Sequence, residues 1–185
     1  YRRSINSNAK LGDFDYKSTV NHIAAFYLWG IEEIQDGELI NLIIENGRSE
    51  ELSRIPNFFW EVNDQIKGKQ REDLTPRILQ LWQKMYKRVE KSDLDDKEKV
   101  LSNLSKFMKY FEQIDEEIAP LLKASAPYVN NGFNVPFFLE ELNRLKNYSH
   151  SKQTAKHIGE ILMSMLNNFT PDFQESDIKD LVSYM

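Results

Sequence analysis

The side chains that could bind a metal or transfer protons are few and scattered in this 185-residue sequence. The three histidines are His22, His150 and His157, and none stands in a His-x-x-x-His or Glu-x-x-His pattern. Those are spacings that place two ligands on one helix face. Adjacent acids such as Glu32-Glu33 and Asp95-Asp96 diverge by about 100° around a helix, so they do not share a site. We therefore expect no metal site and no catalytic motif.

Glycine and cysteine patterns do not point to a cofactor either. The seven glycines form no Gly-x-Gly-x-x-Gly, no Gly-Lys-Ser/Thr loop and no Gly-x-Ser-x-Gly elbow, the motifs that cradle phosphates or expose a nucleophile. Because the chain has no cysteine, disulfides, thiolate zinc sites and thiol catalysis are excluded. We expect no cofactor. An enzyme remains a third hypothesis, with its site assembled from scattered acids and His157.

One basic cluster has helical spacing. Its members recur at intervals of three and four residues, and they are Lys84, Lys87, Arg88 and Lys91. Such a face could contact phosphates or an acidic partner, or it could be the solvated back of an amphipathic helix. A nucleic-acid groove would combine part of this face with further basic residues: Lys67, Lys69 and Arg71.

Aromatic residues gather in two short runs, Phe26-Tyr27 with Trp29, and Phe58-Phe59-Trp60. Neighbouring residues point in different directions around a helix, so three aromatics cannot all face one core. Either they fill both sides of an inner helix, or some lie in a groove or a contact surface. The second interpretation predicts these partner-binding side chains in addition to the basic cluster: Phe26, Trp29, Phe58 and Trp60.

Helical periodicity dominates the sequence that must position these residues. No segment alternates apolar and polar residues as a strand does, so we predict an all-α fold of about nine helices. Thr75-Pro76 reads as an N-cap followed by a first-turn proline, Pro56 as another helix start, and Gly47 as a C-terminal stop. The expected helices are 19–34, 38–46, 56–66, 76–91, 96–111, 114–124, 136–145, 151–166 and 175–185.

The apolar stripes of these helices predict the core. We expect the following side chains to be buried: Leu81, Trp82, Met85, Leu104, Phe107, Phe138, Leu142, Ile158, Leu162 and Leu166. Short turns between the helices favour antiparallel neighbours. The sequence therefore predicts stacked antiparallel hairpins, as a short right-handed solenoid or as an irregular bundle.

Alternate helix starts recur about every 40 residues, near 18, 56, 96, 136 and 175, with the intervening helices near 38, 76, 114 and 151. Pro56-Asn57-Phe58-Phe59-Trp60-Glu61 is also similar to Pro136-Phe137-Phe138-Leu139-Glu140 two periods later. Over residues 18–185 the chain thus resembles HEAT and armadillo-type helical repeats. That resemblance implies a binding surface within a larger protein, with no particular ligand.

Composition sets the remaining expectations. The chain is 41% hydrophobic and 29% charged, as folded domains are, and its net charge of −5 opposes general binding to a polyanion. The longest uncharged apolar stretch, Ile23–Ile31, is too short to cross a bilayer. We expect no membrane partner and a cytoplasmic location. Because the sequence opens with Tyr1-Arg2-Arg3, we also expect a fragment of a longer protein or a chain whose leader was removed. Residues 1–17 would be a linker or arm and 18–185 one domain.

Three functional hypotheses follow. The first is a non-catalytic helical-repeat module that contacts a protein partner or other domains of its parent chain. The alternative is a nucleic-acid-binding helical domain that uses the basic face around Lys84–Lys91. The third is the enzyme assembled from scattered acids, which would need a deep polar cleft.

Overall fold

All secondary structure in the described part of the chain is helical, as predicted. The computed structural model describes residues 16–29, 37–66, 69–129, 134–148 and 152–167. These residues form eight α-helices and three 3₁₀ segments without a strand: α2 (Tyr16–Trp29), α3 (Glu38–Asn46), α4 (Ser49–Val62), η3 (Asn63–Gln65), α5 (Lys69–Glu90), α6 (Lys97–Leu104), η4 (Ser105–Tyr110), α7 (Ile118–Ser125), η5 (Ala126–Tyr128), α8 (Asn134–Tyr148) and α9 (Lys152–Leu166). The predicted helix at 175–185 and residues 1–15 of the predicted arm lie outside the described residues.

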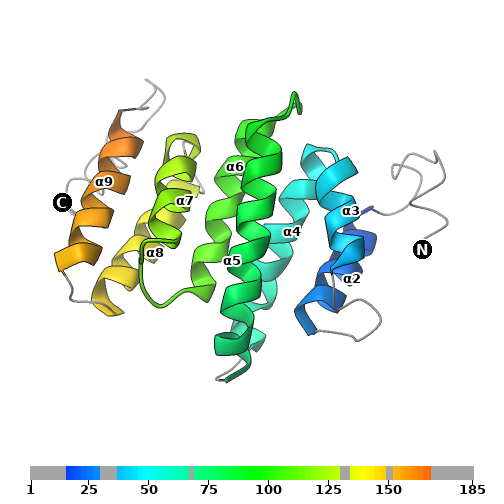
Figure 1. Ribbon diagram of the computed structural model, residues 1–185, viewed down its shortest axis with the longest axis horizontal. Helices are drawn as coiled ribbons and strands as arrows, with labels where there is room; N and C mark the ends of the chain where they lie inside the picture. The colour runs from blue at the N-terminus through cyan, green and yellow to red at the C-terminus, as the bar shows by residue number, and fades with distance from the viewer. Residues whose placement is uncertain (1–15, 30–36, 67–68, 130–133, 149–151, 168–185) are drawn as a thin grey trace.

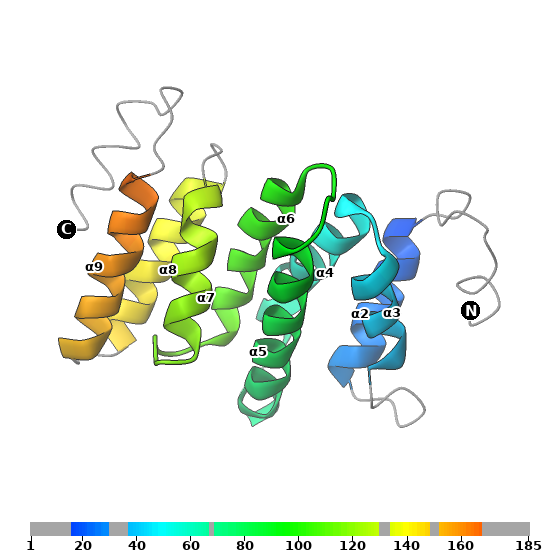
Figure 2. The same ribbon diagram turned by 45° about the horizontal axis from the view of Figure 1, so that its top comes forward.

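The helices lie side by side along the long axis of the molecule, from α2 and α3 at one end to α8 and α9 at the other (Figures 1 and 2). Their packing alternates along the chain. Among the even-numbered helices, α2 packs against α4 and α4 packs against α6. Helix α8 continues this row by packing against the 3₁₀ segment η4. The odd-numbered helices do the same, with α3 against α5, α5 against α7 and α7 against α9.

Two predicted helix starts are wrong, because proline did not begin either helix. Helix α4 begins at Ser49 and α5 at Lys69, so Pro56 and Pro76 lie inside them. Thr75 is not an N-cap; its hydroxyl donates to the Tyr110 carbonyl over 3.0 Å. A proline inside a helix costs about 3 kcal/mol. Here the apolar stripe continues through each proline, and its burial offsets that cost.

The spacing of the helices is correspondingly less regular than the sequence predicts. The even-numbered helices begin at Tyr16, Ser49, Lys97 and Asn134, which gives steps of 33, 48 and 37 residues. The predicted helix at 96–111 also divides, since α6 ends at Leu104 and the chain continues as the 3₁₀ segment η4. The average step stays near 40 residues, while the individual units differ in length.

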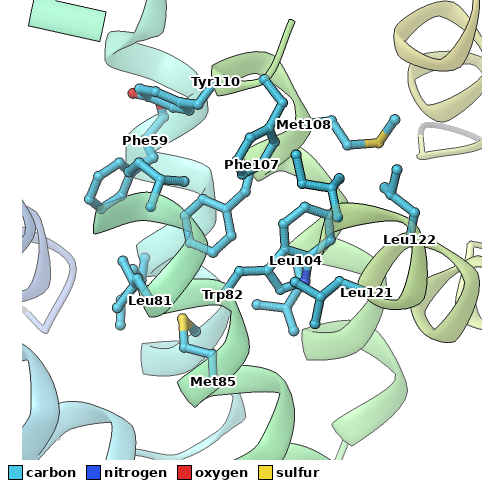
Figure 3. Close-up of a cluster of buried hydrophobic side chains, with 14 of the residues drawn as sticks. Phe59, Leu81, Trp82, Met85, Leu104, Phe107, Met108, Tyr110, Leu121 and Leu122 are labelled. Atoms are coloured by element: carbon cyan, nitrogen blue, oxygen red, sulfur yellow. The ribbon is translucent and has the colours of Figure 1, made fainter. Parts of the chain in front are cut away.

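The core runs through the middle of the stack, where α4, α5, α6, η4 and α7 converge (Figure 3). Trp82 lies in this cluster with its ring centroid 6.1 Å from that of Phe107 and 5.9 Å from that of Phe111. Nine of the ten predicted core side chains are buried, and the tenth, Leu166, is partly buried against the core. Burial of these stripes is the main force that holds the helices together.

Side-chain hydrogen bonds also join helices that are far apart in the sequence. The Tyr27 hydroxyl of α2 donates to the Arg77 carbonyl of α5 over 3.1 Å. The Arg77 guanidinium donates to the Tyr27 carbonyl and lies 4.7 Å from the Tyr27 ring centroid. At the other side of the core, Arg144 of α8 donates to the Met108 carbonyl of η4 over 2.8 Å. These contacts fix the ends of the stack to its centre.

Candidate functional site, a basic groove between α3 and α5

The four basic residues singled out in the sequence line one groove. Lys84, Lys87 and Arg88 lie on the outer face of α5 and Lys91 directly follows the last residue of that helix; all four border a cavity of about 530 Å³. Their positions follow from the core, because the buried stripe Ile78, Leu81, Trp82, Met85 and Val89 holds the opposite face of the helix inward. From Lys84 to Lys91 the row spans about 10 Å along the helix axis.

Helix α3 supplies the second wall of the groove, with Asn41, Ile44 and Glu45. The Lys84 ammonium donates to the Asn41 side-chain oxygen over 3.3 Å. The Arg88 guanidinium donates twice to the Glu45 carbonyl, over 3.2 and 3.3 Å. Carbonyls in the last turn of a helix have no partner within that helix, so an arginine there stabilises the end of α3. The basic row of α5 thus also holds α3 in place.

The groove keeps most of its positive charge. Among the described residues, none of the four cations forms an ion pair, and Lys84, Lys87 and Lys91 are exposed. Glu45 contributes one opposing carboxylate to the wall. The lining thus has four basic side chains and one acidic one, on a chain whose net charge is −5.

Glu90, the acid next to Lys91 in the sequence, is engaged elsewhere. The Tyr86 hydroxyl donates to its carboxylate over 3.1 Å. Burial of the Tyr86 ring, together with the neighbouring Glu90 charge, raises the pKa of that hydroxyl to about 12. The phenol therefore stays protonated at neutral pH and keeps donating to Glu90.

A second groove lies between α7 and α9, near the other end of the stack. It has a volume of about 490 Å³, and its lining includes Lys123, Lys156, Glu160 and Met163. Here the charges are paired, because the Glu160 carboxylate lies 3.6 Å from the Lys123 ammonium and 3.9 Å from that of Lys156. Met163 is 49% exposed. This groove is nearly neutral, in contrast to the one between α3 and α5.

The four aromatic residues predicted to contact a partner differ in how far they are exposed. Phe58 is buried beside Phe59, so it belongs to the core. Trp60 is half-buried, with its ring edge-on to Phe137 at 6.3 Å and the Lys109 ammonium 5.1 Å from its centroid. Phe26 is half-buried. Trp29, at the end of α2, is 57% exposed. The structure does not gather the predicted aromatics and the basic row into one surface.

The groove also contains residues that the sequence did not single out. Asn41 and Glu45 are four residues apart on α3, which is the spacing of one helix face. That spacing was visible in the sequence. However, nothing local indicated that this face would lie opposite Lys84 and Arg88, both 43 residues away from their partners.

The scattered acids and histidines form one contact of interest. His157 is buried, and its Nε2 atom lies 3.8 Å from a carboxylate oxygen of Glu116. His22 is exposed, and His150 lies outside the described residues. In the described part of the chain, no three of these side chains converge as metal ligands would. The basic residues Lys67, Lys69 and Arg71 have no described side-chain positions.

Comparison of the chain with protein families, with curated proteins and with solved structures found no match. The helices of the described ranges include none with the length and apolar character needed to span a membrane. Over the described residues, the fold and the site together define an all-α protein with a basic surface groove.

Proposed function

We propose that this chain is a non-catalytic helical-repeat module that binds a protein partner, or another domain of its parent chain, through the groove between α3 and α5. The observation that carries the proposal is the convergence of Lys84, Lys87, Arg88 and Lys91 with the α3 wall on one open groove. The expected cytoplasmic location belongs to the same proposal.

The solenoid of hairpins predicted from the sequence remains part of this proposal. Its support is the packing of even-numbered helices against even-numbered ones and of odd-numbered helices against odd-numbered ones along the chain. In helical-repeat proteins such an arrangement leaves long helix faces open on each side, and these faces serve as binding surfaces. Helix α5 lies at the centre of the stack (Figure 2), and in this proposal its outer face is such a surface.

A protein partner suits the groove better than a nucleic acid does. The row of cations is only about 10 Å long, and the opposite wall carries the Glu45 carboxylate. A nucleic acid presents phosphates at every nucleotide and would bring some of them toward that carboxylate. A polypeptide can place acidic residues against α5 and neutral residues against α3.

The experiment is a selection from a random peptide library displayed on phage, with the purified chain as bait. Two variants with equal charge change separate a groove effect from a net-charge effect. One is K84E/K87E/R88E/K91E, and the other reverses four exposed lysines elsewhere, K17E/K99E/K146E/K152E. We expect a peptide consensus that the groove variant loses and the control variant keeps. The absence of any consensus, or a consensus that survives in the groove variant, would contradict the proposal.

The nucleic-acid alternative is tested in parallel with labelled single-stranded and double-stranded DNA and RNA at low and moderate salt. Phosphate contacts release counterions, so binding to this groove would weaken steeply with salt. We expect no such binding in the micromolar range. Micromolar binding that the groove variant abolishes and the control variant keeps would promote the nucleic-acid function.

A further inference from the structure

We propose that the groove recognises an acidic peptide segment, and that its cations divide into two pairs. In this proposal, Lys87 and Lys91 bind carboxylates of the partner, while Lys84 and Arg88 hold α3 against α5 and shape the groove. The inference rests on the proposed function and adds the chemistry of the partner and the role of each cation.

The first pair is engaged within the protein. Lys84 donates to Asn41 over 3.3 Å, and Arg88 donates to the Glu45 carbonyl over 3.2 and 3.3 Å. Both contacts cross from α5 to α3. Arg88 is half-buried, so its guanidinium has less contact with water than the ammonium groups of the exposed lysines in the groove. The first pair therefore forms the joint between the two walls.

The second pair is available to a partner. Lys87 and Lys91 border the same groove and are exposed. Within the described ranges, neither ammonium makes a hydrogen bond or an ion pair. Lys87 lies in the last turn of α5 and Lys91 is the first residue after that helix, so the two lysines are four residues, about one helical turn, apart. Two carboxylates one helical turn apart in a peptide match this spacing.

The other wall determines which acidic ligand fits. Ile44, Glu45 and the carbonyl end of α3 face the cations across the groove. A helix C-terminus carries partial negative charge, which adds to that of the Glu45 carboxylate. A ligand with charge on one side only, such as an amphipathic acidic peptide, avoids this repulsion. We therefore assign the carboxylates of aspartate and glutamate, rather than a phosphate chain, to Lys87 and Lys91.

Binding of synthetic peptides tests the assignment by fluorescence anisotropy at low and moderate salt. The probe is a labelled amphipathic peptide with glutamates one turn apart and apolar residues on its other side. A peptide with glutamine in place of each glutamate, a phosphoserine version and a labelled oligothymidylate are the comparisons. We expect the glutamate peptide to bind most tightly and the glutamine peptide at least tenfold more weakly. Equal binding of the glutamate and glutamine peptides, or tighter binding of either phosphate ligand, would overturn the carboxylate assignment.

Paired variants test the division of roles. We expect K87E/K91E to weaken the glutamate peptide at least tenfold, while amide exchange in residues 38–46 stays unchanged. The matched variant K146E/K152E, with the same charge change at exposed positions outside the groove, should keep the affinity. K84Q/R88Q should instead speed exchange in residues 38–46. The division is wrong if K84Q/R88Q leaves that exchange unchanged, or if K87E/K91E binds the peptide normally.

The two proposals fail in distinguishable ways. A displayed consensus that depends on the groove but is not acidic would leave the protein-binding function standing and overturn this inference. The acidic turn of this chain, with Asp93, Asp95 and Asp96, is a further source of carboxylates. Self-association that K87E/K91E abolishes, measured by sedimentation, would make a second copy the occupant and overturn the assignment to a separate partner.

Discussion

At the scale of single residues, the least usual side chain is Lys106 of η4, which is 7% exposed. Its ammonium donates to the Asn57 side-chain oxygen over 2.6 Å and lies 5.9 Å from the centroid of the Trp60 ring. Burial lowers the pKa of this ammonium; the Arg54 charge lowers it further, and Glu61 opposes the shift. Removing a lysine ammonium from water disfavours its charged form, which lowers its pKa.

The sign of the effect on stability follows from linkage. In the unfolded chain Lys106 keeps its ordinary pKa of 10.5, above the folded value. Between the two values the unfolded state binds more protons, so the free energy of unfolding rises with pH in the range just below 10.5. We expect Lys106→Met to remove this rise, as measured by urea unfolding at several pH values from neutral to about 10.

Lys109→Met is the matched control, because the Lys109 ammonium also lies over the Trp60 ring, 5.1 Å from its centroid. The raised pKa values of Tyr27 and Tyr86 lower the free energy of unfolding as the pH rises above the ordinary tyrosine pKa of 10.0. They do so equally in all three chains, so the difference between variants isolates Lys106. The attribution to Lys106 is wrong if its variant keeps the rise or if the Lys109 variant loses it.

At the scale of elements, the joint between α3 and α4 determines how the groove wall is held. Gly47 ends α3 as predicted, in an extended conformation (φ −70°, ψ 151°) rather than a left-handed one, and its N–H donates to the Ile43 carbonyl over 2.7 Å. The buried Glu51 then accepts the Arg48 N–H over 2.7 Å and its guanidinium over 2.9 Å. The Arg48–Glu51 bonds cap the start of α4, which follows the end of α3 after Gly47 and Arg48.

Glycine is needed at position 47 because of space. A Cβ there would lie 2.5 Å from the Ile43 carbonyl oxygen. We expect Gly47→Ala to lower the free energy of unfolding by about 1–3 kcal/mol, the range for overpacked sites. In contrast, a Cβ at Gly159 of α9 meets no atom within 4 Å. Gly159→Ala should therefore stabilise the protein by about 0.5–1 kcal/mol, because alanine favours a helix interior.

Urea unfolding of both glycine variants measures the contrast. Each carries the same added methyl group, so their difference reflects the two surroundings and not the change in composition. Equal effects of the two substitutions would show that the close approach at Gly47 does not constrain the joint.

At the scale of the whole molecule, α2, α4 and α6 pack in one row and α3, α5, α7 and α9 in another. In a helical repeat of the kind we propose, stability is a sum of units and of interfaces between neighbours, so the ends can open before the centre. Leu81 of α5 is in the central core, whereas Leu162 belongs to α9 at one end; both are buried. The two positions thus report on different parts of the stack.

We expect Leu81→Ala and Leu162→Ala each to lower the stability of the part of the stack around the substituted residue by about 2–5 kcal/mol. Hydrogen exchange read by segment should show Leu162→Ala exposing residues 118–128 and 152–166 while 38–62 stays protected. Leu81→Ala should lower protection across the central helices. If both variants lower protection evenly along the chain, the molecule unfolds as one unit, and the repeat-like arrangement does not govern its stability.

The sequence by itself determined the helical class, the buried stripes and the basic row of α5. All three are local properties, because a period of 3.6 residues places Leu81 and Met85 on one side of a helix and Lys84 and Lys91 on the other. The chain needs no distant contact to create that separation. For the same reason α3 kept its predicted bounds, Glu38–Asn46.

Three features were decided only by the tertiary structure. They are the helix starts upstream of Pro56 and Pro76, the aromatic side chains that enter the core, and the helix that faces the basic row. Packing energy gathered along a whole stripe outweighs the local cost of Pro56 and Pro76, so local rules misplaced those starts. Phe58 became a core residue because of its neighbours in space. The groove exists because α3 and α5 meet across 43 residues of sequence, and an encounter over that distance is set by the packing of the entire stack.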